Sequence, residues 1–178
     1  MKTTFTLIAF FILSLSFAQN DTKKTDSTSH ISVKDLTFMI GTWEGEGWIM
    51  KSKTKQEFIQ KETIRPSLDS TILIIDGLGH DKKDTTKIIH EAFGVISLNA
   101  ESKLIEMLSF SKANGKMETP ILFLGEGKLQ WSFKDERGGT IRFSEDFSED
   151  GLWVEKGEYS FDGKNWFNFF EMKLNRVE

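Results

Sequence analysis

The sequence predicts an all-β protein, a single up-and-down antiparallel β-barrel of about ten strands that follows one short N-terminal helix. Strand-like segments succeed one another from residue 42 to the C-terminal end of the chain. The breaks between them are short and carry turn residues, as in Asn114-Gly115 and Asp162-Gly163. Short breaks join antiparallel neighbours, and a meander of this length removes its exposed edges by closing on itself.

The N-terminal segment, residues 1–18, has the features of a secretory signal peptide. Lys2 precedes an unbroken apolar stretch at 7–13, and small residues flank Phe17. The stretch is too short to span a bilayer comfortably, so we expect cleavage after Ala18 and no membrane span in the mature protein. We therefore expect an exported protein that is periplasmic or extracellular.

The remaining chain has the size and composition of one domain. Residues 19–31 are polar and predict a flexible tether, whereas 32–178 is long enough for one packed core. The chain has no cysteine, which excludes disulfides and thiol chemistry. Its net charge is −4 and it has no basic run longer than a pair, so we expect no nucleic-acid partner, because such a partner needs a basic patch.

The elements can be placed in order along the chain. A helix is predicted over 31–40, where apolar residues have helical spacing and Ser32 followed by Asp35 resembles a capping box. Gly41 ends this helix. The strands are predicted at 42–50, 55–65, 71–79, 86–98, 103–111, 118–124, 128–134, 140–147, 152–160 and 165–176.

Two late strands carry carboxylates among apolar residues. Alternation places Glu145 with Phe143 on one face of the eighth strand, and Glu155 with Trp153 and Tyr159 on one face of the ninth. If both faces point inward, the two carboxylates share an apolar cavity, where they fix a polar ligand head or act as acid and base. A register slip of one residue would place them outside.

Three further glutamates have a similar but less regular setting, and they are weaker candidates of the same kind: Glu62, Glu106 and Glu171.

One short motif resembles a known family. Residues 41–47 read Gly-Thr-Trp-Glu-Gly-Glu-Gly and follow the predicted helix directly. A Gly-x-Trp at this place resembles the signature of the lipocalins and their calycin relatives, and the longer form is similar to the ten-stranded nitrobindin-like branch and to uncharacterised secreted lipocalin-like proteins. The resemblance implies that Trp43 plugs the closed end of the barrel. It also implies that a basic residue of the last strand lies over Trp43, either Arg176 or Lys173.

The resemblance also bears on cofactors. Lipocalins carry small apolar molecules, whereas nitrobindin-like proteins bind haem through a histidine near the C-terminus. The histidines here are His30, His80 and His90, and residues 140–178 contain none, so we expect no haem and no other cofactor. The acidic turn at 80–84 does not predict a metal site, because ligands on one tight turn rarely converge.

We interpret the chain as a secreted, non-enzymatic binding protein that holds a small, mostly apolar molecule in a barrel cavity. One alternative is a barrel enzyme that uses Glu145 and Glu155. Others are a haem-binding nitrobindin-like protein and an interaction module with a fully packed interior. A barrel fold alone does not decide among these. No catalytic residue is assigned, because no Ser-His-Asp or Cys-His set can be assembled.

The last strand carries four large rings within five residues: Trp166, Phe167, Phe169 and Phe170. Regular alternation would place at least one pair of them outside the barrel. Exposed rings of that size usually mark a contact site. We expect them to pack against a second copy in a homodimer or against the N-terminal helix folded over the strand.

Overall fold

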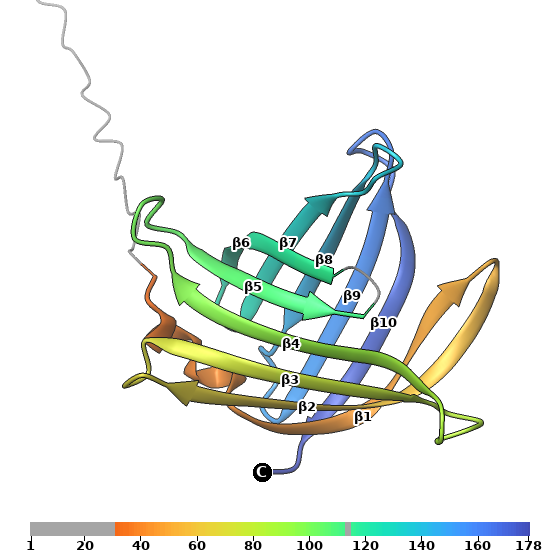
Figure 1. Cartoon of the computed structure of the whole chain (residues 1–178), viewed down its shortest axis with the longest axis horizontal. Helices are drawn as coiled ribbons and strands as arrows, with labels where there is room; N and C mark the ends of the chain where they lie inside the picture. Colours follow the sequence, from red (N-terminus) through yellow and green to blue (C-terminus); the bar gives the residue numbers. More distant parts are fainter. Residues whose placement is uncertain (1–30, 113–114) are drawn as a thin grey trace, which may run out of the picture.

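The computed structural model describes residues 31–112 and 115–178, and its ten strands form one closed antiparallel barrel (Figure 1). Each strand pairs with its neighbours in the chain, and the first pairs with the last to close the barrel. The predicted meander is therefore confirmed. The elements are the 3-10 helix η1 (Val33–Met39) and the strands β1 (Gly41–Lys51), β2 (Thr54–Ser67), β3 (Ile72–Asp81), β4 (Ile88–Leu98), β5 (Ile105–Ser111), β6 (Gly115–Gly125), β7 (Lys128–Lys134), β8 (Thr140–Asp146), β9 (Leu152–Ser160) and β10 (Phe167–Arg176).

The segments predicted before the barrel are outside this description. The signal peptide expected at 1–18 lies wholly outside the described residues, and so does the tether expected at 19–31 apart from Ile31. Within the described part of the chain, no helix has the length and apolar character needed to cross a membrane.

The predicted element bounds agree with the structure to within a few residues. The largest difference is at β6, which begins at Gly115 and not at 118, because it remains paired with β5 as far as Ser111. The N-terminal helix is a 3-10 helix. The backbone N–H of Ser32 donates to the Asp35 carboxylate at 2.7 Å, as the capping pattern predicted.

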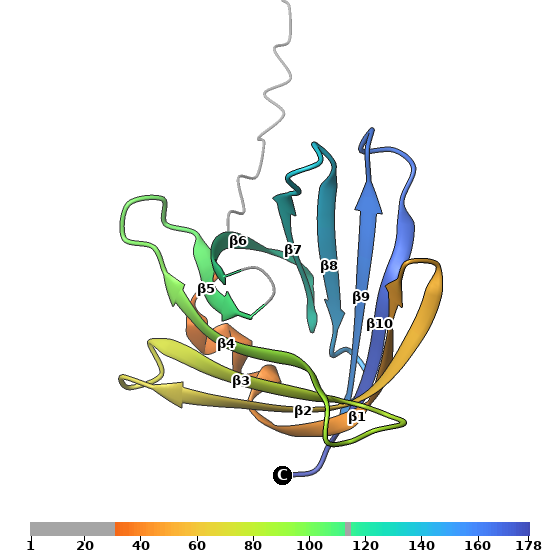
Figure 2. The same cartoon turned by 45° about the vertical axis from the view of Figure 1, so that its right-hand side comes forward.

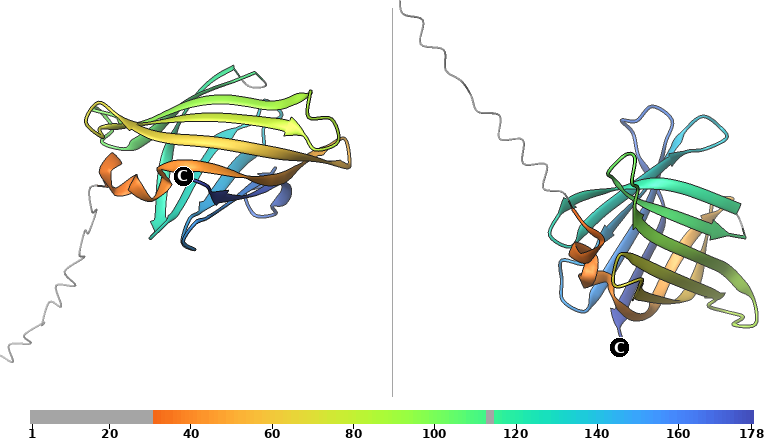
Figure 3. Two further views of the ribbon diagram at one scale, coloured as in Figure 1. Left: turned by 90° about the horizontal axis from the view of Figure 1, so that it is seen from below. Right: turned by 60° about the vertical axis from the view of Figure 1, so that its left-hand side comes forward.

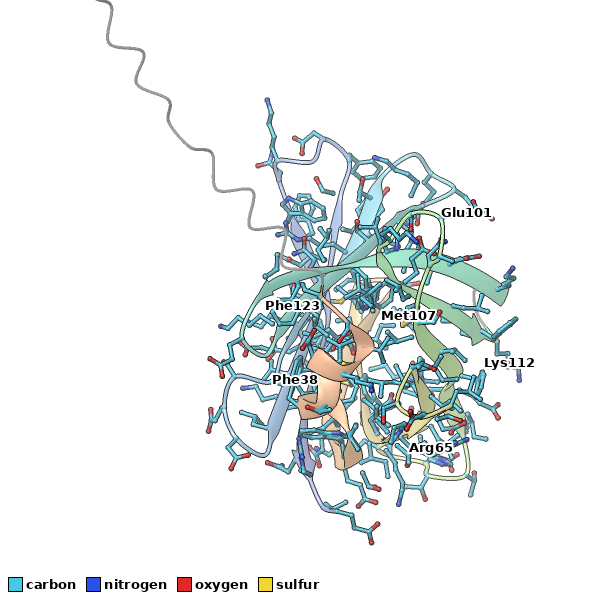
Figure 4. The ribbon with its side chains drawn as sticks, turned by 90° about the vertical axis from the view of Figure 1, so that its left-hand side faces the viewer. Phe38, Arg65, Glu101, Met107, Lys112 and Phe123 are labelled. Carbon is cyan, nitrogen blue, oxygen red and sulfur yellow. The ribbon has the colours of Figure 1, made fainter. Side chains whose placement is uncertain are left out.

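The two ends of the barrel are different. Helix η1 lies across one end, which we call the closed end, and Figure 4 looks onto it with Phe38 and Phe123 labelled. The Phe38 ring lies 6.5 Å from that of Phe123 and 5.4 Å from that of Phe147. The turns that join β1 to β2, β3 to β4, β7 to β8 and β9 to β10 lie at the opposite end, which we call the mouth (Figure 2).

The glycines of β1 allow other strands to come close. A side chain at Gly45 would overlap the carbonyl of Lys173 on β10, and one at Gly47 would overlap the Phe58 ring. β1 therefore lies unusually close to the backbone of its neighbour β10 and to the Phe58 ring of β2, which only glycine permits at these two positions. At the mouth, Ser52 and Lys53 turn β1 directly into β2, and both have positive φ, 48° and 79°.

The rings at the start of β10 do not alternate as predicted. The pairing of β10 with β9 shifts register between Asn168 and Phe170. Because of this bulge, Phe169 and Phe170 both reach the Phe143 ring inside the barrel, each with centroids 5.8 Å apart. The prediction that regular alternation holds from Trp166 to the end of the strand is therefore wrong at its start.

The other two rings do not pack inside the barrel. Trp166 lies on the outer face under the Arg142 guanidinium, whose Cζ is 3.7 Å from the ring centre. Phe167 pairs with the inward-facing Tyr159 at the rim of the mouth and is 63% exposed. Helix η1 does not cover them, since it packs at the closed end (Figure 3). The suggestion that the helix folds over the last strand is wrong, and the homodimer stays a prediction.

Candidate functional site

The inward face of each strand follows from the buried plug residue, Trp43. Directly paired residues on neighbouring strands point to the same side of a sheet, and Trp43 on β1 pairs with Glu62 on β2. Going the other way round the barrel, Met172 of β10 is on the inward face of its strand, is buried and pairs with Glu155, which in turn pairs with Glu145. All three glutamates therefore point into the barrel, and we call them the carboxyl cluster.

The closed end is sealed by Trp43 as the resemblance implied. Its indole Nε1 donates to the carbonyl of Met39 at 2.8 Å. The Arg176 guanidinium lies over the ring, with Cζ 4.5 Å from the centre, and donates to the carbonyl of Phe38 at 2.6 Å. Arg176 and not Lys173 is thus the clamp, and these contacts are structural.

Glu145 and Glu155 meet inside the barrel as the alternation predicted. Each is 8% exposed, and their side chains share a hydrogen bond. Glu145 Oε1 accepts from the indole of Trp131 at 3.0 Å, and its Oε2 accepts from the indole of Trp153 at 2.5 Å. Since both oxygens of Glu145 accept hydrogen bonds, Glu155 supplies the proton that the pair shares.

Burial controls the protonation of this pair. Desolvation raises the pKa of both carboxyls, and the charges of Glu145 and Glu62 raise the pKa of Glu155 further. The two indole N–H groups act in the opposite direction and lower the pKa of Glu145. The pKa of Glu155 is therefore raised more strongly than that of Glu145, and Glu155 holds the shared proton more firmly.

Glu62 completes the cluster, although it was only a weak candidate on the sequence alone. Burial raises its pKa to about 8, partly opposed by a hydrogen bond from Gln60 Nε2 to Glu62 Oε1 at 2.7 Å. The charges of Glu145 and Asp76 add to the increase. The available signal was the alternation of buried Phe58, Gln60, Glu62 and Ile64 along β2.

The other two weak candidates are not in the cluster. Glu106 accepts hydrogen bonds from Asn99 and Ser102 near the β4–β5 turn, and Glu171 pairs with Trp48 on the outer face.

Gln60 brings a second unusual polar group to the cluster. It is 4% exposed, and its Oε1 has no hydrogen-bond partner among the described residues. Two glycines of the neighbouring strand β3 lie against the polar ends of Glu62 and Gln60. A Cβ at Gly77 would lie 2.6 Å from both Glu62 carboxyl oxygens, and one at Gly79 would overlap Gln60 Oε1. The two glycines therefore leave the space that the acceptors occupy.

The mouth-side half of the barrel is lined by rings that are only half-buried. Trp131 and Phe143 stack with centroids 4.3 Å apart, and Phe143 meets Phe170 at 5.8 Å. Phe133 and Ile141 continue this inward face and are also half-buried. Towards the closed end many of the inward side chains are fully buried instead, among them Trp43, Leu129 and Trp153. The rings nearer the mouth are thus only partly covered, whereas the carboxyl cluster is buried.

Tyr159 does not join the cluster, although the sequence grouped it with Glu155. It faces inward near the mouth, where its hydroxyl lies against Gly139 and has no hydrogen-bond partner among the described residues. Arg137 lies 4.8 Å from the centre of its ring. Of the predicted ligand-binding residues, Glu145, Glu155, Phe143 and Trp153 come together and Tyr159 stands apart.

The described residues contain no group of three or more histidine, aspartate or glutamate side chains arranged to hold a metal ion. They also do not fit haem in the way the resemblance implies. That resemblance places the iron ligand on the C-terminal strands, where this chain has no histidine. His90 faces inward near the mouth, but it comes from β4, on the other side of the barrel.

No protein-family model matches the sequence, and no curated protein is significantly similar to it. Several solved structures are similar to this barrel, including the following two. Rv2717c from M. tuberculosis has a TM-score of 0.59 at 11% identity, over 82% of this chain and 97% of that chain. The S-type phycobiliprotein lyase CPES from Guillardia theta has a TM-score of 0.56 at 13% identity, over 83% of this chain and 94% of that chain. These likenesses support a calycin-like fold.

Proposed function

We propose that the protein binds a small, mostly apolar molecule inside the barrel. The observation that carries this proposal is a set of half-buried inward rings, including Trp131, Phe143 and Phe170, directly above buried carboxyls. Small-molecule sites commonly combine apolar walls with a few polar groups that fix orientation. The apolar body of the ligand would contact the rings, and its polar end would reach Glu145 and Glu155.

A comparison with a similar structure also supports the proposal. One of the similar structures is named as a phycobiliprotein lyase, which is consistent with a barrel used around small molecules. Because the same fold hosts unrelated functions, the proposal depends on the rings and carboxyls of this chain and not on the fold.

We propose a binding role and not an enzymatic one. The alternative enzyme would use Glu145 and Glu155 as acid and base, and their raised pKa values suit such chemistry. However, both oxygens of Glu145 already accept indole N–H groups, and its remaining partner is Glu155. A carboxylate held by three donors is better suited to a fixed polar floor than to removing a proton from a substrate.

The test is a titration with the neutral probe N-phenyl-1-naphthylamine, monitored by fluorescence. We expect saturable binding of one probe per chain, and Phe143→Ala should weaken it at least tenfold. The matched control is Phe110→Ala, because that ring is on the outer surface and 44% exposed. Saturation with neither variant affected, or no saturation at all, would contradict interior binding and favour the packed interaction module.

We also propose export, on the basis of residues 1–18 alone. Expression of the full chain in a secreting bacterial host should yield a mature form that begins near Gln19 in the periplasm or medium. Recovery of the chain only with Met1 intact would contradict this.

A further inference from the structure

We propose that the polar end of the ligand is an amine, bound as an ammonium group by Glu62 and Gln60 beside the Glu145–Glu155 pair. This inference rests on the proposed function, because it names the ligand class of the same cavity. It follows from the hydrogen-bond inventory of the barrel interior.

One buried acceptor below the half-buried rings has no donor among the described residues. Gln60 uses its Nε2 on Glu62, which leaves its buried Oε1 without a partner. A buried carbonyl without a hydrogen bond is costly, and folded proteins rarely leave one. A ligand that donates hydrogen bonds would satisfy Gln60 Oε1, and an ammonium group carries enough donors to reach the Glu62 carboxyl as well.

The cluster also has no positive partner within the protein. Among the described residues, every ion pair lies elsewhere, and none includes Glu62, Glu145 or Glu155. Arg176, the cation nearest in strand register, is engaged over the Trp43 ring and at the Phe38 carbonyl. Ionisation of Glu62 would therefore leave a buried negative charge without a partner, and an ammonium group of the ligand would supply that partner.

The charged groups around Glu62 in the described part of the chain are all carboxyls, so the site favours a positively charged ligand head over a negatively charged one. The charges of Glu145 on β8 and Asp76 on β3 raise the pKa of Glu62. The charge of Glu62 in turn raises the pKa of Glu155 on β9. The neighbour on β1 is Trp43, which is uncharged. An anionic ligand head would add to this repulsion, whereas an ammonium would relieve it.

Binding of an ammonium should therefore be linked to proton release. With a pKa of about 8, Glu62 is mostly protonated at pH 7 in the free protein. A positive charge beside it favours the ionised carboxylate and releases up to one proton. The affinity for an amine should accordingly increase as the pH rises from 7 towards 8, while the affinity for a neutral ligand of the same shape should not.

Isothermal titration calorimetry with three matched probes tests the inference: 4-phenylbutylamine, 4-phenylbutan-1-ol and 4-phenylbutanoate. At pH 7 we expect the amine to bind at least tenfold more tightly than the alcohol, and the carboxylate to bind most weakly. Glu62→Gln should abolish the amine preference and leave the alcohol affinity in place. The matched control is Glu57→Gln, because Glu57 lies on the same strand but is exposed on the outer face.

A second measurement uses only the wild-type protein, so it does not depend on how the variants fold. Titration of the amine at pH 7 in buffers of different ionisation enthalpy should reveal the release of a sizeable fraction of one proton per amine bound, and none for the alcohol. Equal affinities for the amine and alcohol with no proton release would overturn the amine inference but leave apolar binding intact. Tightest binding of the carboxylate would also overturn it. Failure of all three probes and of the neutral naphthylamine probe would reject the proposed function as well.

Discussion

The closed end and the mouth half of the barrel are lined by the same kinds of side chain, yet their polar groups are satisfied differently. At the closed end, Trp43 donates to Met39, and Arg176 donates to Phe38. Both polar groups thus find backbone partners, and the rings in contact with Trp43, those of Phe147 and Trp153, are buried. Nearer the mouth, the rings are half-buried, and Gln60 Oε1 lacks a partner among the described residues.

Trp153 belongs to both regions and shows where one gives way to the other. Its ring packs edge-on against Trp43 with centroids 6.0 Å apart, and its Nε1 donates to Glu145. Aromatic content alone therefore does not distinguish a structural core from a binding site in this barrel. Solvent access and incomplete hydrogen bonding separate them, because these leave room and reason for a ligand.

The largest expected effect is at the plug. Trp43→Ala should lower the free energy of unfolding by about 3–5 kcal/mol, the usual cost of emptying a buried aromatic site. Arg176→Ala should cost less, and the two losses should not add, because the side chains touch. Urea denaturation of the single and double variants measures this, with Phe110→Ala as an exposed-ring control. Strict additivity would show that the two residues do not act as one plug.

The carboxyl cluster should make the fold less stable as the pH rises. Glu62 has a pKa of about 8 in the fold against an ordinary value of 4.5, so it binds more protons when folded. The stability that this gives is fully present below pH 4.5 and is lost as the pH rises through about 8. Glu62→Gln should recover up to about 5 kcal/mol at pH 9 relative to wild type.

Urea denaturation at intervals from pH 4.5 to 9 checks this, and Glu57→Gln should leave the wild-type slope unchanged. Asp135 and Asp146 have pKa values lowered to about 2, so the stability that they give is lost only below about pH 4, outside this window. Glu145 and Glu155, whose pKa values are also raised, leave part of the slope in the variant. A slope in Glu62→Gln as steep as that of the wild type would show that Glu62 is not buried as a neutral acid.

Alanine substitutions at two glycines of the barrel interior should lower the stability by different amounts. Gly77→Ala should cost about 1–3 kcal/mol, because the new Cβ would meet the Glu62 carboxyl at 2.6 Å. Gly94→Ala is the matched control, since its Cβ would make ordinary contacts of 3.5 Å or more with Ile75 and Met107. Thermal melts at pH 6 compare the two. Equal losses would mean that Glu62 does not lie over β3.

The smallest effect on the fold is expected at Phe167, which is 63% exposed at the mouth end of β10. Phe167→Ser should change the stability of the monomer by less than about 0.5 kcal/mol. If the protein forms the proposed homodimer through this ring, the same change should dissociate it in sedimentation experiments at micromolar concentration. A wild-type protein that is already monomeric there would reject the dimer.

The features that depend on local pattern could be predicted from the sequence alone. Period-two alternation, turn residues and short breaks predicted ten strands close to their observed bounds. The glycine-rich motif placed Trp43 at the closed end, and alternation within single strands put Glu145 with Phe143 and Glu155 with Trp153 on the faces that the structure confirms as inward. These features depend only on residues that are close together in the sequence, so a single sequence is enough to predict them.

Contacts between residues that are far apart in the sequence became known only from the tertiary structure. The bulge that turns both Phe169 and Phe170 inward depends on the pairing of β10 with β9, and no local pattern marks it. The convergence of Gln60 and Glu62 with Glu145 joins strands about eighty residues apart. Closure of the barrel fixes their register, and one residue of slip would have turned every one of these side chains outward. The carboxyl cluster is therefore a property of the closed barrel and not of any segment of the sequence.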